Sequence, residues 1–217
     1  MKQYQTYVCK KCGNEVEVQK VGGGKLVCCG EAMHCVTENL TVVNLMKAFA
    51  GESQARNKYE FFAEIARKEG FRDIAEHFQR AANNEKQHAK MEFALAHKMM
   101  DGKEWGDTAQ NLGYARDGEN YEHVTMYPDF AIIAKEEGFN EAAALFRGIG
   151  KVEVEHENMY KELLRRLESG EEFVSEDGEE EWICEVCGHI HRGKKPPKVC
   201  PLCKVEEEYF SRLNTKK

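Results

Sequence analysis

The chain contains the stretch Ile65-Ala66-Arg67-Lys68-Glu69-Gly70-Phe71, which returns as Ile133-Ala134-Lys135-Glu136-Glu137-Gly138-Phe139 at an offset of 68 residues. Around both copies, apolar residues recur at spacings of three and four, which is the pattern of an amphipathic helix. Each copy therefore predicts a helix, a turn with glycine near the helix end, and a second helix. Two such hairpins predict a four-helix bundle with approximate two-fold symmetry over residues 37–168.

Charged residues interrupt the predicted inner face of every helix. The motif Glu-x-x-His occurs twice at the repeat offset, and a Gly-Glu pair precedes each copy. One such motif alone would indicate solvated surface charge, but both copies lie on the apolar seam of their helix. Buried carboxylates need a cation between them, and this pattern matches the ferritin-like template for two iron or two manganese ions. The predicted ligands are Glu52, Glu85, His88, Glu119, Glu122, Glu153 and His156.

The two halves differ in one stretch. Glu122 corresponds to Ala55 in the first half, so one carboxylate has no twin. From Glu119 to Tyr127 there is one residue more than from Glu52 to Tyr59, and it falls just before a proline. An unadjusted helix would turn Tyr127 off the seam by about 100°, so we expect a π-bulge between Glu119 and Tyr127.

Several side chains near the predicted site have open roles. Tyr59 and Tyr127 would lie beside the ligands, either as hydrogen-bond donors to carboxylates or as core aromatics. Three further histidines lie off the ligand seams and are interpreted as helix-surface or packing residues: His77, His97 and His123.

The nine cysteines lie only near the two ends of the chain. Two C-x-x-C loops near the C-terminus predict a tetrahedral thiolate site for zinc or a single iron, formed by Cys184, Cys187, Cys200 and Cys203. Near the N-terminus one such loop is followed by an adjacent pair, giving a second candidate site from Cys9, Cys12, Cys28 and Cys29. Segments this small need a bound metal or another cross-link to fold stably, so structural zinc remains an alternative at both sites. Cys35 is interpreted as an inert thiol.

Composition sets the remaining boundaries. We predict a four-cysteine domain at residues 1–36, the helical bundle at 37–168, a solvated acidic linker at 169–181 and a second four-cysteine domain at 182–217. The net charge of -7 is unfavourable for nucleic-acid binding. The first residues do not read as a signal peptide, and no apolar run approaches the roughly 20 residues of a membrane span. We therefore expect a soluble, cytoplasmic protein that binds neither nucleic acid nor membrane.

Residues 38–217 resemble rubrerythrin. The resemblance rests on Ala50-Gly51-Glu52-Ser53-Gln54-Ala55-Arg56-Asn57, on Met126-Tyr127-Pro128, on the ligand motifs above and on the rubredoxin-like cysteine loops. The N-terminal part is similar to desulforedoxin through Tyr7-x-Cys9-x-x-Cys12-Gly13 and Gly22-Gly23-Gly24-x-Leu26-Val27-Cys28-Cys29-Gly30. The order of the three parts matches that of the desulforubrerythrins.

This resemblance implies a cofactor set and an activity. It implies iron rather than zinc in both four-cysteine sites, and a two-iron site that reduces hydrogen peroxide to water. Glu122 is then the added carboxylate. One iron would move between Glu122 and His88 as its oxidation state changes. The predicted catalytic residues are the seven ligands with Tyr59 and Tyr127. Electrons would pass through the rubredoxin-like iron from an NADH-linked reductase.

The resemblance also implies a homodimer or homotetramer. The role of the N-terminal four-cysteine domain stays open between an electron entry point and a dimer contact. Two other functions compete with peroxide reduction. One is ferritin-like iron oxidation and storage, and the other is a zinc-knuckle interaction protein on a helical scaffold.

Overall fold

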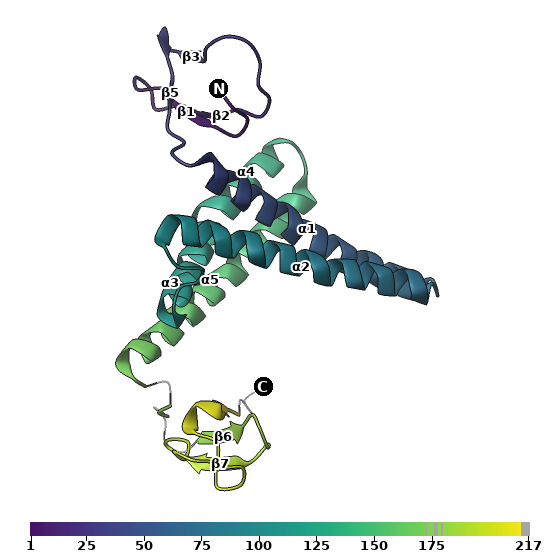
Figure 1. Ribbon diagram of the computed structural model, residues 1–217, viewed down its shortest axis with the longest axis vertical. Coiled ribbons are helices and arrows are strands. Elements are labelled where there is room, and N and C mark those ends of the chain that lie inside the picture. Colours follow the sequence, from purple (N-terminus) through teal and green to yellow (C-terminus); the bar gives the residue numbers. More distant parts are fainter. Residues whose placement is uncertain (172, 176–177, 179, 214–217) are drawn as a thin grey trace. The chain divides into compact units, whose positions relative to one another are not determined.

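Figure 1 shows the computed structural model, which describes residues 1–171, 173–175, 178 and 180–213. The chain divides into two compact units, Met1–Trp105 and Gly106–Lys217. Each unit combines one helical hairpin with one small, cysteine-rich group of strands. No helix of the described residues is long and apolar enough to cross a bilayer.

The first unit begins with five short strands. β1 (Thr6–Val8) lies between β2 (Glu15–Glu17) and β5 (His34–Cys35) in an antiparallel sheet, and β3 (Val27–Cys28) pairs with β4 (Glu31–Ala32). These strands lie within the stretch for which the sequence predicts a four-cysteine domain.

Two long helices follow, α1 (Leu40–Lys68) and α2 (Arg72–Asp101). The side chain of Asn39 caps α1 by accepting hydrogen bonds from Thr41 and Val42. Gly70 ends the hairpin turn with φ of +89°, a left-handed conformation that glycine adopts without strain. Small residues at every seventh position of α2 are buried and allow the two helices to approach closely: Ala75, Ala82, Ala89 and Ala96.

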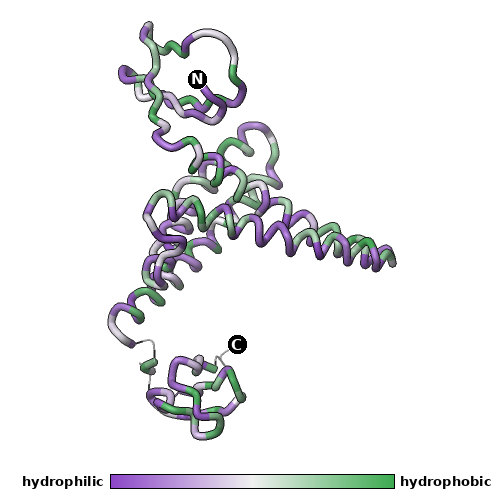
Figure 2. The backbone as a smooth tube through the Cα atoms, viewed as in Figure 1, coloured by the Kyte–Doolittle hydropathy of each residue, from purple (hydrophilic) through white to green (hydrophobic). Residues whose placement is uncertain are grey.

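The second unit repeats the hairpin with one modification. The helix α3 (Thr108–Tyr121), the π-helix η1 (Glu122–Met126) and the helix α4 (Tyr127–Glu136) follow one another without a break, and α5 (Asn140–Ser169) packs against all three. The π-bulge expected before Pro128 is therefore confirmed. Gly138, with φ of +87°, repeats the turn of the first hairpin. Figure 2 shows hydrophobic and hydrophilic residues alternating along these helices, as amphipathic helices require.

The chain ends in a small three-stranded sheet. β6 (Glu180–Cys184) lies between β7 (Ile190–Gly193) and β8 (Phe210–Arg212), and the 3-10 helix η2 (Glu207–Tyr209) precedes β8. The core is Trp182, whose indole N–H donates to the carbonyl of Gly193 over 3.0 Å. Phe210 and the cysteines pack around it.

The acidic stretch predicted to be a solvated linker is shorter and partly packed. Ser169 belongs to α5 and residue 180 begins β6. Phe173 packs against the Trp182 core, and Ser175 is buried with its N–H donating to the carbonyl of Lys194. The prediction failed there because burial of the Phe173 ring stabilises the packed conformation by more free energy than the acidic residues beside it cost. Positions 172, 176, 177 and 179 lie outside the described residues.

Candidate metal centres

The first hairpin gathers three of the predicted ligands. Glu52 comes from α1, and Glu85 and His88 come from α2, with donor atoms within 4.8 Å of one another. His88 Nδ1 lies 2.8 Å from Glu85 Oε2 and 4.0 Å from Glu52 Oε2. One turn of α2 separates Glu85 from His88, so both side chains leave the same face of the helix.

The second hairpin builds the same group from equivalent residues. Glu119 of α3 meets Glu153 and His156 of α5, again within 4.8 Å. His156 Nδ1 lies 2.6 Å from Glu153 Oε2 and 3.8 Å from Glu119 Oε2. The Glu153 side chain is 11% exposed and that of Glu119 is 20% exposed. Each hairpin thus presents two carboxylates and one imidazole as a unit.

The electrostatics of both groups favour a bound cation. A hydrogen bond with Glu85, together with burial, raises the pKa of Glu52 above its ordinary value. Burial and the charges of Glu153 and Glu122 raise the pKa of Glu119. Carboxylates packed this closely repel unless a proton or a metal ion lies between them. Oxygen and imidazole donors suit iron, so these residues fit one iron at each three-residue group.

Glu122 and the two tyrosines take different places. Glu122 stands at the start of η1, half-buried, and is not one of the three residues whose donor atoms converge. Its charge nevertheless reaches Glu119 and Tyr127, because it raises the pKa of both. Burial contributes most to the raised pKa of Tyr127. Tyr59 packs in an aromatic group with Phe62 and Phe78, with ring centroids 6.3 and 6.2 Å away. The ring of Tyr127 likewise lies 6.2 Å from that of Phe146.

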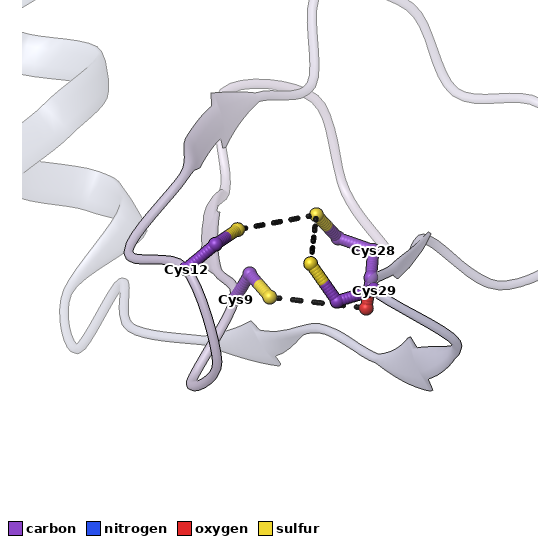
Figure 3. A group of neighbouring side chains, drawn as sticks. All are labelled: Cys9, Cys12, Cys28 and Cys29. Carbon is purple, nitrogen blue, oxygen red and sulfur yellow. Dashed lines mark hydrogen bonds between the residues drawn. The ribbon is translucent and has the colours of Figure 1, made fainter.

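Figure 3 shows the four N-terminal thiols converging from two loops. Cys12 Sγ lies 3.5 Å from Cys28 Sγ, which lies 3.8 Å from Cys29 Sγ. The edge of a tetrahedron with metal–sulfur bonds of about 2.3 Å is about 3.8 Å, so the spacing fits a four-coordinate metal. The adjacent pair reaches this geometry because Cys29 adopts φ of +52°. Cys35 lies in β5, outside the group.

The C-terminal thiols form a second group of the same kind. Cys184 Sγ lies 3.6 Å from Cys203 Sγ, and Cys187 Sγ lies 3.7 Å from Cys200 Sγ. Burial opposes ionisation of Cys200, but the backbone N–H groups of Cys203 and Leu202 lower its pKa to about 6. Near the N-terminus, backbone N–H groups likewise lower the pKa of Cys9 to about 7. One thiol of each group therefore ionises readily, whereas hydrogen bonds with the neighbouring thiols raise the pKa of Cys29 to about 12.

The three other histidines divide between the surface and the interior. His77 is exposed on α2, as predicted, and the ring of His97 packs 4.3 Å from that of Phe93. His123 is more than a packing residue, because it hydrogen-bonds to Glu157, a buried carboxylate of α5. The sequence-based interpretation missed this pair, although Glu157 lies at a seven-residue spacing with Ala143, Gly150 and Leu164 on α5.

Comparisons with known proteins agree with these sites. The family model described as rubrerythrin matches residues 43–164, the rubrerythrin rubredoxin-like domain matches 182–211, and the desulfoferrodoxin N-terminal domain matches 1–36. With the donor sets above, these matches identify iron as the cofactor of the carboxylate and four-cysteine sites, and they confirm the predicted ferritin-like fold with a four-cysteine unit at each end.

Individual relatives cover different parts of the chain. A rubrerythrin of Porphyromonas gingivalis is 45% identical over 182 residues, covering 81% of this chain and 90% of its own. A desulfoferrodoxin of Nitratidesulfovibrio vulgaris is 58% identical over 36 residues, 17% of this chain and 29% of its own. A solved structure of partially reduced nigerythrin shares 32% identity, covering 79% of this chain and 86% of its own, with a TM-score of 0.31. Since the rubrerythrin model spans more than half of the chain and the Porphyromonas relative aligns along most of it, this protein belongs to the rubrerythrin family of di-iron oxidoreductases.

Proposed function

We propose that the protein is a peroxidase that reduces hydrogen peroxide to water and so protects its cell against oxidative stress. The reaction consumes one peroxide, two electrons and two protons, and it yields two water molecules. The two irons, when bound, supply one electron each. The chain's own residues hold the irons, exclude water and orient the peroxide.

The observation that carries this proposal is the position of Glu122. The π-helix adds this carboxylate beside Glu119 in one half of the repeat, where the first half has Ala55. An extra carboxylate gives one iron an alternative ligand as its charge changes. A protein that only stores iron has no evident use for such a one-sided addition.

Tyr127 supports the same chemistry. Burial and the charges of Glu122, Glu153 and Glu119 raise its pKa, so its phenol stays protonated at neutral pH. A protonated phenol can donate a hydrogen bond near the reacting oxygen atoms. Tyr59 is less suited to this role than its counterpart, because the first half has Ala55 where the second half has Glu122.

We further propose that the four-cysteine irons deliver the electrons. Two one-electron sites in the same chain match the two electrons that each peroxide requires. The donor would be a separate NADH-linked reductase. We also propose a homodimer or homotetramer, since large apolar helix side chains, among them Phe62 and Ile133, are 43% and 51% exposed in the single chain.

The test uses the iron-loaded protein, reduced without oxygen and mixed with peroxide or with oxygen in a stopped-flow instrument. Peroxide should be consumed faster than oxygen, and the colour of the thiolate irons should return as electrons leave them. Glu122→Ala should slow peroxide consumption, while Glu155→Gln, an exposed carboxylate on α5, should leave it unchanged.

Two outcomes would overturn the proposal. Oxygen consumption faster than peroxide consumption, with iron accumulating beyond the bound sites, would indicate a ferritin-like ferroxidase. A colourless protein that contains zinc alone, even after growth in iron, would indicate a zinc-knuckle interaction protein.

A further inference from the structure

Glu157 of α5 is a buried carboxylate that belongs to none of the metal groups. The residue is 6% exposed. Its Oε1 accepts a hydrogen bond from Asn120 Nδ2 over 2.9 Å, and its Oε2 accepts one from His123 Nε2 over 3.0 Å. Lys161 Nζ lies 2.8 Å from Oε1 and balances the charge. A carboxylate this buried needs hydrogen-bond partners for its oxygen atoms. Here one partner comes from α3 and the other from η1.

The two hydrogen-bond donors lie on either side of Glu122. Asn120 belongs to the last turn of α3, and His123 is the second residue of η1. The carbonyl of Glu122 accepts the backbone N–H of Tyr127, five residues on, and this bond closes the π-turn. The carboxylate of Glu157 therefore bridges the point at which the helix changes from α to π.

The first half of the chain serves as an internal comparison. At the repeat offset of 68 residues, the buried stripe of α2 and the matching stripe of α5 align position by position. The first stripe consists of Ala75, Ala82, Ala89 and Ala96, all buried, and the second consists of the buried Ala143, Glu157 and Leu164 together with the half-buried Gly150. Glu157 therefore stands where the first half has a buried alanine, in a seam between helices where a carboxylate is costly.

Three features occur together in the second half of the helical repeat, and the first half has none of them. The second half has the π-helix, the added carboxylate Glu122 and the buried Glu157. The first half has a regular α-helix from Leu40 to Lys68, Ala55 in place of Glu122 and Ala89 in place of Glu157. A carboxylate that only held two helices together would be equally useful in both halves.

The C-terminal end of the π-helix also packs closely against α5. A methyl group added at Gly150 would lie 3.3 Å from the Cβ of Tyr127, a tight contact that the glycine avoids. The equivalent position in the first half is Ala82. The extra residue of the π-turn thus brings Tyr127 close to α5 at one end, while Glu157 binds the other end.

We propose that Glu157 is a positioning residue, which holds the π-helix in the register that presents Glu122 to the metal site. Its effect on peroxide turnover rests on the proposed function, whereas its effect on the backbone does not. Glu157→Ala, which copies the first half, is the direct test. Glu157→Asp, with the same charge on a shorter side chain, and the exposed Glu155→Gln are its controls.

The first measurement is structural and independent of activity. In a crystal structure of iron-loaded Glu157→Ala, we expect the N–H of Tyr127 to lose its bond to the Glu122 carbonyl and residues 122–126 to become α-helical or irregular. Backbone amides of this segment should exchange with deuterium on the order of tenfold faster than in the parent protein, since hydrogen bonds to a charged group are lost. An unchanged π-helix with unchanged exchange would overturn the proposal.

The second measurement separates positioning from general stability. Glu157→Ala should lower the maximal rate of peroxide turnover to the level of Glu122→Ala, and the double variant should be no slower than either single variant. Glu157→Asp should recover part of the rate. Additive losses, or a loss that follows the melting temperature across all variants, would mean that Glu157 only stabilises the hairpin and would overturn the proposal. A parent protein that does not turn over peroxide would overturn the proposed function, while the crystallographic and exchange results still decide the role of Glu157.

Discussion

Removing the indole of Trp182 should release the iron of the C-terminal domain while leaving the helices intact. This side chain is 1% exposed and packs among Cys184, Cys200 and Phe210. Truncation of a buried tryptophan to alanine costs about 3–5 kcal/mol, and the lost hydrogen bond to Gly193 adds about 1 kcal/mol. A domain of this size has a folding free energy of only roughly 2–5 kcal/mol without its metal.

The loss should appear as weaker iron binding, because metal binding and folding are coupled in such small domains. About 4 kcal/mol corresponds to roughly a thousandfold in the binding constant. Trp182→Ala should therefore lose its C-terminal iron at chelator concentrations about a thousandfold lower than the parent protein does. Trp182→Phe, which loses the hydrogen bond but keeps an aromatic ring, should show a change of about tenfold.

The assay follows thiolate-iron absorbance and helical circular dichroism during titration with chelator. About half of the thiolate absorbance should disappear early, with the helical signal unchanged. A reduced two-iron site should still react once with peroxide, but turnover that depends on an external electron donor should fall, since one of the two four-cysteine irons is lost. Trp105→Ala removes the same side chain from an exposed position in the other unit and should retain all iron. If Trp182→Ala held its C-terminal iron as tightly as the parent protein, the link between this core and the metal would be refuted.

Three further predictions concern the helical part. Glu85→Ala should reduce peroxide turnover by about a hundredfold or more while leaving thiolate-iron colour unchanged, and normal turnover by stopped flow would contradict the ligand assignment. In protein stripped of its two-iron metal, stability in urea should fall as pH rises through the raised pKa of Glu119, because the folded chain there holds a proton that the unfolded chain has released. Iron-loaded protein should lack this dependence, and an identical pH profile in both forms would argue against a metal at Glu119. Gly138→Ala should lower the free energy of unfolding by about 1–2 kcal/mol because of the left-handed φ, whereas Gly138→Asn should lower it less. Equal urea midpoints for all three proteins would count against strain at this turn.

Much of the helical architecture could be predicted from short-range patterns. Apolar spacings fix helices because neighbours on a helix face are three and four residues apart. Gly70 and Gly138 marked the turns for the same kind of local reason, since few other residues adopt their backbone conformation. The π-helix was also predictable, because one extra residue between Glu119 and Tyr127 must be accommodated before a proline.

The failures occurred where a side chain's role depends on a partner far away in the sequence. The acidic segment before residue 180 was interpreted as solvated from its charge, yet Phe173 packs on the Trp182 core. His123 was interpreted as a packing residue, yet it hydrogen-bonds to Glu157, which lies 34 residues further along the chain. Tyr59 and Tyr127 occupy matching places in the repeat and make matching aromatic contacts, and what distinguishes Tyr127 is the nearby charge of Glu122.

The sequence by itself determined which residues form helices, which side chains share a helix face, and which thiols and carboxylates are spaced to chelate. These properties follow from helix geometry and from chain connectivity over a few residues. Only the tertiary structure decided that a buried carboxylate bridges the start of the π-helix and that adjacent cysteines converge with a distant loop. Those contacts depend on how two helices or two loops approach each other, and a linear pattern does not specify that approach.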